Sequence, residues 1–251
     1  MRIIISPAKK MNIDTDSLPY RTMPDFLLET SMLFSILQEK SYDDLKKLWK
    51  CNDSIAALNY DRLQNLDLYA QLTPAILAYE GIQYQYMAPS VFTQQAMEYI
   101  QEHLRILSGF YGIVRPFDGI VPYRLEMQAK LSVDGHKNLY SFWGDKLARK
   151  LCYETDCIIN LASKEYSACI SAYLPKDFRF ITCTFAEEKN GKRIEKGTMC
   201  KMARGEMVRL MAENQIENPE DLQSLSCLDY RFTPHLSTPL NYIYLRVATN
   251  S

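Results

Sequence analysis

The apolar residues of this chain fall into short runs that alternate with stretches of helical spacing. The runs predict strands at residues 2–6, 75–79, 157–162, 178–188 and 241–247, and Asn190-Gly191 is typical of a hairpin turn. Helical spacing predicts helices at residues 91–107, 140–153, 164–172 and 198–214. Strands and helices are interspersed without a regular β-α-β count. The pattern therefore indicates an α+β fold, or an irregular α/β one, in a single domain over residues 1–251.

Residues 24–66 show helical patterns only. Pro24 is suited to the first turn of a helix, and apolar residues follow it at helical spacing. Ser41 is a typical N-cap for a second helix that ends near Lys50, and a third is expected over residues 53–66. We expect this helical segment to form a cap or insertion beside a mixed core.

Composition excludes some classes of protein. The 251 residues are 47% apolar and 24% charged with a net charge of −1, so no global basic field indicates nucleic-acid binding. Any such site must come from local clusters among the 29 Lys and Arg residues. The chain has no stretch near the roughly 20 apolar residues of a membrane span and no signal-peptide pattern at its start, so a cytoplasmic location is expected.

The cysteines and histidines show no metal-binding pattern. Seven cysteines are scattered singly without a C-x-x-C pair, and the three histidines lie in unrelated contexts. We expect reduced thiols, most of them buried as small apolar side chains, and neither a catalytic cysteine nor a structural metal. The G-x-S-x-G, P-loop and G-x-G-x-x-G motifs are absent, and nothing in the sequence implies a cofactor.

Residues 107–127 concentrate glycine in a chain that has only nine glycines. Gly109 and Gly112 sit in the segment Leu107–Ile113, which is similar to the turn of a helix-hairpin-helix element, where main-chain N–H groups bind a phosphate. In that motif the glycines are two residues apart, whereas here they are three apart, and Pro116 prevents a long second helix. The alternative is a glycine that ends a helix, followed by a close backbone crossing.

Basic residues flank the same stretch. Arg105, Arg115 and Arg124 can hold an anion, and Tyr123 can stack on a base. Arg124 and Glu126 share a face if the chain is extended, as a structural ion pair or as a glutamate that positions an anion-binding arginine.

Polar residues also follow two predicted strands. Lys9 comes after the first strand, in a loop suited to a site but equally to a solvated surface. Asn160, Ser163 and Tyr166 lie at the exit of the strand at 157–162 and the start of the next helix, where ligands bind and where simple helix capping is also common.

A third group of basic residues lies on the helix predicted at 198–214. Lys201 and Arg204 share one face of it. Gly205 costs a mid-helix position about 1 kcal/mol relative to alanine, so another helix or a ligand must come close there.

Five blocks of sequence together resemble the YaaA family of peroxide stress response proteins. They are ISPAK (5–9), LRILSGFYGIVRPFDGIVPYRLEM (104–127), LYSFWGD (139–145), INLASKEY (159–166) and KMARGEM (201–207). The resemblance implies a cantaloupe-like α+β topology, a helix-hairpin-helix element, a basic cleft, duplex DNA binding and protection of DNA from peroxide and iron. Three positions depart from the family pattern, namely Lys10, Gln128 and Lys164.

The site residues implied by the resemblance form two sets. The DNA- or anion-binding set is Lys9, Arg105, Gly109, Gly112, Arg115, Arg124, Lys201 and Arg204. The pocket set is Glu126, Asn160, Ser163, Glu165 and Tyr166, and the matched positions also include Trp143 and Asp145.

Two functional hypotheses follow. The first is a stress protein that binds duplex DNA without sequence preference through a local basic cleft. The second is an enzyme that acts on a nucleotide, base or other small anionic metabolite in the same pocket. A long open groove would favour the first, and a pocket of about 300–1,000 Å³ holding glutamate and tyrosine the second. Nothing in the sequence marks a protein-interaction module.

Overall fold

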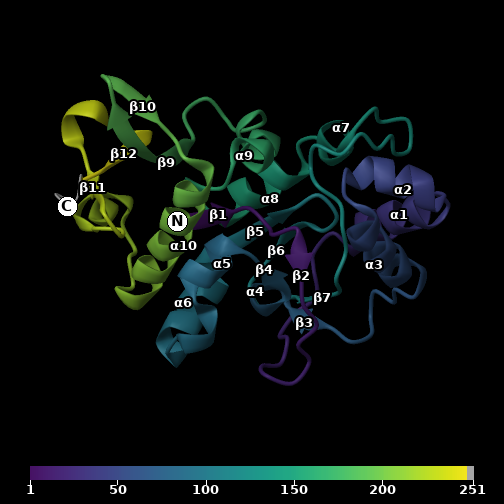
Figure 1. Cartoon of the computed structure of the whole chain (residues 1–251). Coiled ribbons are helices and arrows are strands. Elements are labelled where there is room, and N and C mark those ends of the chain that lie inside the picture. The colour runs from purple at the N-terminus through teal and green to yellow at the C-terminus, as the bar shows by residue number, and fades with distance from the viewer. Residues whose placement is uncertain (248–251) are drawn as a thin grey trace.

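An eight-stranded mixed sheet forms the centre of the computed structural model, which describes residues 1–247 (Figure 1). The strand order is β11-β12-β9-β8-β1-β5-β6, and β10 pairs with the end of β9. The strands are β1 (Arg2–Ile5), β5 (Leu104–Ser108), β6 (Gly112–Val114), β8 (Cys157–Leu161), β9 (Arg179–Lys189), β10 (Lys192–Ile194), β11 (Tyr230–Phe232) and β12 (Asn241–Arg246). Two small ladders join β2 (Lys10–Met11) to β4 (Tyr79–Glu80) and β3 (Thr73–Pro74) to β7 (Gly119–Ile120).

The middle of the sheet is parallel. β1 pairs in parallel with β5 on one side and β8 on the other, and β9 pairs in parallel with β8 and β12. Ile3, Ile4 and Ile5 of β1 are fully buried, which explains the uninterrupted apolar run at the start of the sequence. The chain leaves β1 toward β5 and returns on the opposite side as β8, and a crevice at the carboxyl ends of parallel strands is the usual ligand site at such a switch point.

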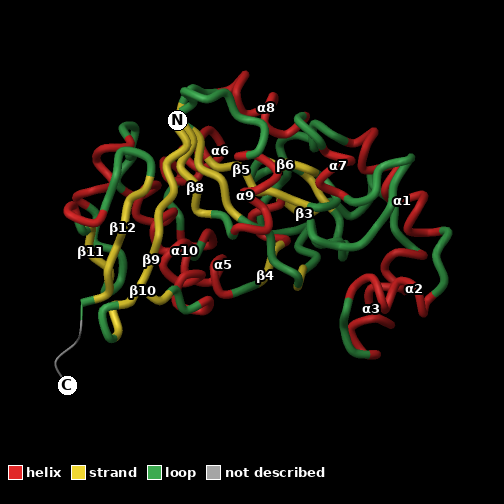
Figure 2. The backbone as a smooth tube through the Cα atoms, turned by 90° about the horizontal axis from the view of Figure 1, so that it is seen from above, coloured by secondary structure: helices red, strands yellow, loops and turns green. Residues whose placement is uncertain are grey.

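Helices cover the sheet on both faces. In Figure 1, α5, α6 and α10 lie below the central strands and α8 and α9 lie above them. The helical segment α1–α3 lies at the end of the molecule opposite β10–β12 in both Figure 1 and Figure 2. The α-helices are α1 (Leu27–Gln38), α2 (Tyr42–Trp49), α3 (Asp53–Gln64), α4 (Ala75–Ala78), α5 (Ile82–Met87), α6 (Gln94–His103), α7 (Leu139–Trp143), α8 (Lys146–Glu154), α9 (Lys164–Ser171) and α10 (Gly197–Glu213). Short 3₁₀ helices cover Pro89–Val91, Pro219–Ser224 and Pro234–Leu236.

The single-domain α+β class and most predicted elements are confirmed, and three elements are corrected. Residues 75–78 form helix α4, not a strand, and only Tyr79 continues as strand β4. The helix predicted at 91–107 ends at His103, because Leu104–Ser108 pair with β1 as a fully buried strand. The helix predicted at 140–153 is two helices, α7 and α8, which are separated at Gly144, where φ is +49°.

The glycine-rich segment is a β-hairpin, and the helix-hairpin-helix interpretation of Leu107–Ile113 is wrong. Strands β5 and β6 pair antiparallel through Ser108 and Gly112, and the turn between them is buried. The hydroxyl of Ser108 accepts the N–H groups of Phe110 and Tyr111 at 3.1 and 2.8 Å, so the turn satisfies its own donors. The pairing of β5 with β1 and β6 therefore determines the backbone conformation of this segment.

Candidate functional site

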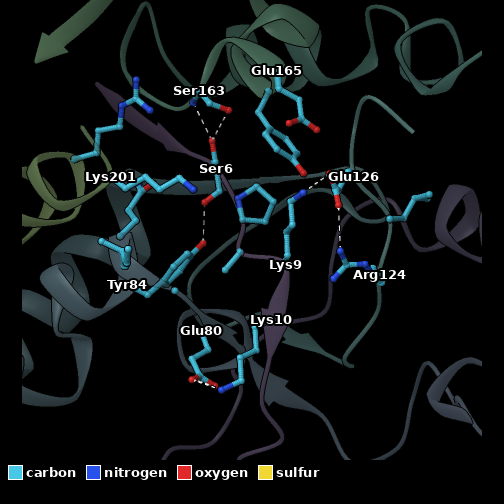
Figure 3. Close-up of a pocket in the computed structure, with 18 of the residues that line it drawn as sticks. Ser6, Lys9, Lys10, Glu80, Tyr84, Arg124, Glu126, Ser163, Glu165 and Lys201 are labelled. Carbon is cyan, nitrogen blue, oxygen red and sulfur yellow. Dashed lines mark hydrogen bonds and ion pairs between the residues drawn. The ribbon is translucent and has the colours of Figure 1, made fainter. Parts of the chain in front are cut away.

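A cavity of about 490 Å³ opens where β1 and β8 end (Figure 3). Its wall combines the loop after β1, the start of α5, the extended segment at 123–126, the start of α9 and one face of α10. The lining residues are Ser6, Pro7, Ala8, Lys9, Lys10, Glu80, Gly81, Ile82, Gln83, Tyr84, Tyr123, Arg124, Leu125, Glu126, Ser163, Glu165, Tyr166, Lys201 and Arg204. We refer to this cavity as the pocket.

The pocket brings together most of the site residues that the sequence predicted. The members found in its wall are Lys9, Arg124, Glu126, Ser163, Glu165, Tyr166, Lys201 and Arg204. They come from segments far apart in the chain, and the parallel pairing of β1 with β8 is what places the loops after these strands side by side.

Two serines join the loops after these strands. The Ser6 hydroxyl accepts the main-chain N–H of Ser163 at 2.9 Å and donates to the Ser163 hydroxyl at 3.2 Å. Tyr84 of α5 donates its hydroxyl proton to the main-chain oxygen of Ser6 at 3.0 Å. The sequence analysis missed Ser6 and Tyr84. The position of Ser6 directly after a buried strand, like that of Ser163, was the signal available for it.

One end of the pocket carries arginine and lysine from α10. Among residues 1–247, Arg204 forms no ion pair, and its buried Nε has no hydrogen-bond partner. The buried side-chain nitrogen of Gln83, on α5, also lacks a partner. Burial lowers the pKa of the Arg204 guanidinium, and the attraction of Cys200, Glu195 and Cys183 only partly offsets the loss of water. Unpaired buried donors are costly, so this end is suited to an anionic ligand that accepts hydrogen bonds.

At the other end of the pocket, the carboxylate of Glu126 forms ion pairs with two cations. Glu126 lies 2.7 Å from the Lys9 ammonium and 3.6 Å from Nη2 of Arg124 (Figure 3). The Arg124 side chain is 9% exposed, and its Nε has no hydrogen-bond partner among residues 1–247. The ion pair between Arg124 and Glu126, which the sequence analysis left open, is therefore present, and Nε of Arg124 is a buried donor without a partner among the described residues.

Glu165 is the second carboxylate at this end and has different surroundings. Burial and the nearby Glu126 raise its pKa, although Lys9 and the main-chain N–H of Gln128, 3.3 Å from Oε1, favour the ionised form. Burial and neighbouring acidic groups, including Glu165, also raise the pKa of Tyr166. Two carboxyl groups with unlike environments are typical of sites that transfer or share protons.

The charges of the lining favour anions as a whole. Lys9, Lys10, Arg124, Lys201 and Arg204 face three glutamates, which gives the wall an excess of two positive charges when all are ionised. Because the cavity walls limit solvent screening, this local excess matters although the whole chain carries a net charge of −1.

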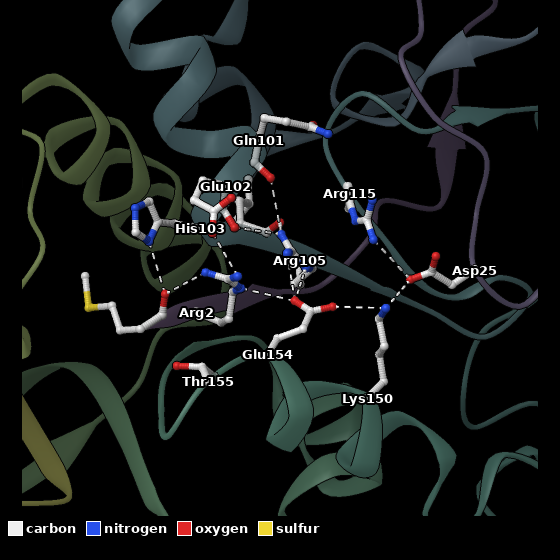
Figure 4. Close-up of polar contacts among 12 residues, drawn as sticks. Arg2, Asp25, Gln101, Glu102, His103, Arg105, Arg115, Lys150, Glu154 and Thr155 are labelled. Atoms are coloured by element: carbon white, nitrogen blue, oxygen red, sulfur yellow. Dashed lines mark hydrogen bonds and ion pairs between the residues drawn. The ribbon is translucent and has the colours of Figure 1, made fainter.

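Arg105, which was predicted to bind an anion, lies outside the pocket in a separate ion-pair network (Figure 4). It is 4% exposed and bonds Glu154 at 2.7 and 2.8 Å, and its Nη1 donates to main-chain oxygens. Arg2 and Lys150 reach the same Glu154 carboxylate at 3.1 and 3.4 Å. These contacts enclose the guanidinium and indicate a structural role for Arg105, and its predicted role in anion binding stays a prediction.

The remaining predicted residues outside the pocket also bond within the protein. Arg115 lies 3.5 Å from Asp25, at the edge of the same network. Asn160 is buried, donates to the Thr182 hydroxyl and accepts the N–H of Ala162.

The two glycines of the hairpin pack against protein. A Cβ on Gly109 would lie 2.6 Å from the main-chain oxygen of Leu125, and Trp143 donates its indole N–H to the Gly109 oxygen at 3.1 Å. Gly112 has φ of +71° and packs on Trp143. The close backbone crossing considered as the alternative is therefore with the segment that carries Arg124 and Glu126. Asp145, a further position matched to the family, is at the start of α8 and pairs with Arg149 at 3.7 Å.

A second hollow is lined by lysines that the sequence analysis missed. Lys40, Lys47, Lys50 and Lys130 line a groove of about 330 Å³ on α2, the residues that flank it and the segment after Met127. Asp44 also lines this groove, but none of the four lysines pairs with a carboxylate within residues 1–247. A small hollow bounded by Lys50 and Glu126 lies between this lysine groove and the pocket. Lys40, Lys47 and Lys50 are close in sequence, and the fold adds Lys130 to them.

The expectation that most cysteines are buried is confirmed. Cys157, Cys169, Cys183, Cys200 and Cys227 are buried, and Cys51 and Cys152 are partly buried, all as free thiols. Burial raises the pKa of Cys169 to about 12, which disfavours its reactive thiolate.

No helix within residues 1–247 is long and apolar enough to cross a bilayer.

The fold and site define an α+β protein with a small, positively charged pocket at the carboxyl ends of parallel strands. The chain belongs to the YaaA family, since the family model described as peroxide stress protein YaaA matches residues 1–236. The resemblance is therefore confirmed, and with it a general role in the stress response.

Relatives match over nearly the whole length. A UPF0246 protein of Agathobacter rectalis is 54% identical over 247 residues, covering 98% of this chain and 99% of the relative. A UPF0246 protein of Pediococcus pentosaceus is 53% identical over 246 residues, covering 98% of each.

Proposed function

We propose that the pocket binds a small phosphate-bearing ligand, such as a nucleotide or another phosphorylated metabolite. The observation that carries this proposal is Arg204, a largely buried guanidinium with no ion-pair partner within residues 1–247. A bound phosphate supplies the missing acceptors and the missing negative charge. Lys201 and the start of α9 at Ser163 add further positive potential at this end.

The size and lining of the pocket support a small molecule over a duplex. Its volume of about 490 Å³ lies within the range of about 300–1,000 Å³ that is typical of small-molecule sites. Tyr123 and Tyr166, together with Pro7 and Leu125, provide apolar surface for the organic part of a ligand. We place this binding in the cytoplasm, as part of the peroxide stress response.

Replacing Arg204 tests the proposal. Isothermal titration of the wild type with pyrophosphate and with adenosine 5′-monophosphate should detect binding, and Arg204→Met should weaken it about 10- to 100-fold. The factor corresponds to the loss of about 1.5–3 kcal/mol from a charge-assisted hydrogen bond. Arg209→Met is the matched control, because Arg209 lies on the same helix but pairs with Glu206 and Glu213 outside the pocket. Unchanged affinity in a folded Arg204→Met protein would contradict the proposal.

The lysine groove favours a second function, duplex DNA binding without sequence preference. Its four lysines have no carboxylate partner within residues 1–247, and the hollow between groove and pocket joins it to the positive wall near Lys9. Lysine side chains neutralise phosphates without reading bases. We propose that this surface, and not the glycine-rich hairpin, holds the DNA that the protein protects.

Salt dependence of DNA binding tests this second function. With roughly four to six phosphate contacts, log K should fall against log salt with a slope of about −4 to −5. Changing Lys47 and Lys130 to Gln should reduce the steepness of that slope by about 2, since each lysine contributes about 0.9. The control is the same change at Lys189 and Lys192, two exposed lysines of the β9–β10 hairpin at the other end of the molecule. A slope that the groove variant leaves intact would exclude this surface.

A further inference from the structure

The two carboxyl groups at one end of the pocket differ in their ion pairing. Glu126 has Lys9 at 2.7 Å and Arg124 at 3.6 Å, so two cations compensate the negative charge of its carboxylate. Glu165 lines the same cavity, and within residues 1–247 it has no cation at ion-pair distance. Among residues 1–247, Oε1 of Glu165 accepts the main-chain N–H of Gln128 at 3.3 Å, and the main chain of Met127 also favours the ionised form. Within the described residues, the charge of Glu165 is therefore less well compensated by cations than that of Glu126.

The groups that face Glu165 come from four segments. Glu126 opposes its ionisation, and Lys9, from the loop after β1, favours it. Tyr140 of α7 donates its hydroxyl to the main-chain oxygen of Glu165 at 2.9 Å, and Tyr166 is its neighbour on α9. Neither tyrosine carries charge near neutral pH, because a phenol ordinarily ionises only near pH 10 and burial raises the pKa of each further. Burial outweighs the favourable contacts and raises the pKa of Glu165, so its neutral form persists to higher pH than that of an ordinary glutamate.

We propose that Glu165 in its neutral form donates a hydrogen bond to the bound ligand, which must carry an acceptor such as a ring nitrogen or carbonyl oxygen as well as a phosphate. This inference rests on the proposed small-molecule function of the pocket. The phosphate lies at the Arg204 end and the acceptor at the Glu165 end, with the organic part against Tyr166 and Tyr123. A nucleotide has this combination of groups. A carboxyl group kept neutral by its surroundings is an effective donor in enclosed sites.

The inference predicts how ligand affinity changes with pH. Adenosine 5′-monophosphate is titrated into the wild type and into Glu165→Gln between pH 5 and pH 8. The glutamine amide donates a similar hydrogen bond but does not ionise. Both proteins see the same titration of the ligand phosphate, whose second pKa is about 6, so the ratio of their affinities isolates Glu165. We expect wild-type affinity relative to Glu165→Gln to fall about tenfold or more across this range, because an ionised Glu165 repels the ligand acceptor and leaves it unpaired.

The outcomes separate this inference from the proposed function. If the wild type binds neither adenosine 5′-monophosphate nor pyrophosphate at any pH, the proposed function fails and this inference with it. If the wild type binds but the affinity ratio is constant with pH, only the role of Glu165 is wrong. Glu80→Gln is the control, since Glu80 also lines the pocket but is paired with Lys10. The ratio of wild-type affinity to Glu80→Gln affinity should stay constant between pH 5 and pH 8.

A measurement on the wild type covers the case in which Glu165→Gln does not fold. Carbon-13 NMR of the assigned Glu165 carboxyl should show its titration midpoint rising by about one pH unit or more at saturating adenosine 5′-monophosphate, which is the linkage to a tenfold preference for the neutral form. Pyrophosphate, which lacks the ring acceptors, should raise the midpoint less. A midpoint that adenosine 5′-monophosphate leaves unchanged or lowers would contradict the inference.

Discussion

Glu154→Gln should reduce the free energy of unfolding by about 3–5 kcal/mol, because it removes the carboxylate from the buried end of an ion-pair network. The Glu154 side chain is 9% exposed, and Arg105, which bonds it at 2.7 Å, is 5% exposed at its side chain. Arg2 is the second arginine on the same carboxylate, at 3.1 Å. The amide keeps the shape of the side chain but not its charge, so the buried guanidinium of Arg105 loses its counter-ion. Urea unfolding at pH 7 measures the loss.

Acid should remove the same contribution in the wild type. Burial opposes ionisation of Glu154, but the attraction of Arg105, Arg2 and Lys150 outweighs it and lowers the pKa of the carboxyl group. A carboxylate with a lowered folded-state pKa contributes stability that is present above its unfolded pKa of about 4.3 and is lost as pH falls through the folded value. Glu154→Gln should therefore lose less stability than the wild type on acidification.

The control for this prediction is an exposed ion pair. Glu220 bonds Arg179 at 2.6 Å, with side chains 60% and 48% exposed. Glu220→Gln should change the free energy of unfolding by less than about 1 kcal/mol, because water screens and replaces the pair. If Glu154→Gln and Glu220→Gln reduce the free energy of unfolding by the same amount, the network around Glu154 does not stabilise the fold as its burial indicates.

Gly205→Ala should destabilise the protein by about 2 kcal/mol or more, although alanine is the better helix former by about 1 kcal/mol. A Cβ at this position would overlap the main-chain oxygen of Gln83 and lie 2.9 Å from its carbonyl carbon and 3.0 Å from the N of Met87. These are backbone atoms of α5, which cannot move aside without separating α5 from α10. Overpacking therefore outweighs propensity, and thermal or urea unfolding measures the net result.

Gly197→Ala is the matched control on the same helix. Apart from its chain neighbours and the backbone of its own helix, no atom of residues 1–247 lies within 4 Å of a Cβ built at Gly197, and this glycine has no left-handed φ. Alanine should therefore leave stability unchanged or raise it by up to about 1 kcal/mol. Because α5 carries Gln83 and α10 carries Arg204, any Gly205→Ala protein that folds should also bind phosphate-bearing ligands more weakly. A stabilised Gly205→Ala protein would show that the two helices yield more easily than their contacts indicate.

The sequence alone was sufficient to predict the helices and strands whose apolar pattern agrees with their final burial. Residues 157–162 read as a buried strand because every side chain of β8 is buried, and residues 198–214 read as a helix because the apolar side of α10 packs on the core. Polar residues placed after such strands, including Lys9 and Ser163, were identified for the same reason, since strand ends lead directly into the pocket wall. The sequence also predicted that another element lies close to Gly205, because glycine within a helix costs stability unless a neighbour requires it.

The contacts of each basic residue, by contrast, depend on the completed fold. Arg105 and Arg204 look alike in the sequence, yet one is enclosed by Glu154 and the other has no partner within residues 1–247. The segment after His103 is a strand because it pairs with β1, and that pairing also turned the glycine-rich stretch into a hairpin. Ion pairs and strand pairing join residues distant in sequence, such as Arg105 with Glu154. Local spacing carries no information about them, because their energy depends on which side chains the completed fold brings together and how much water it removes.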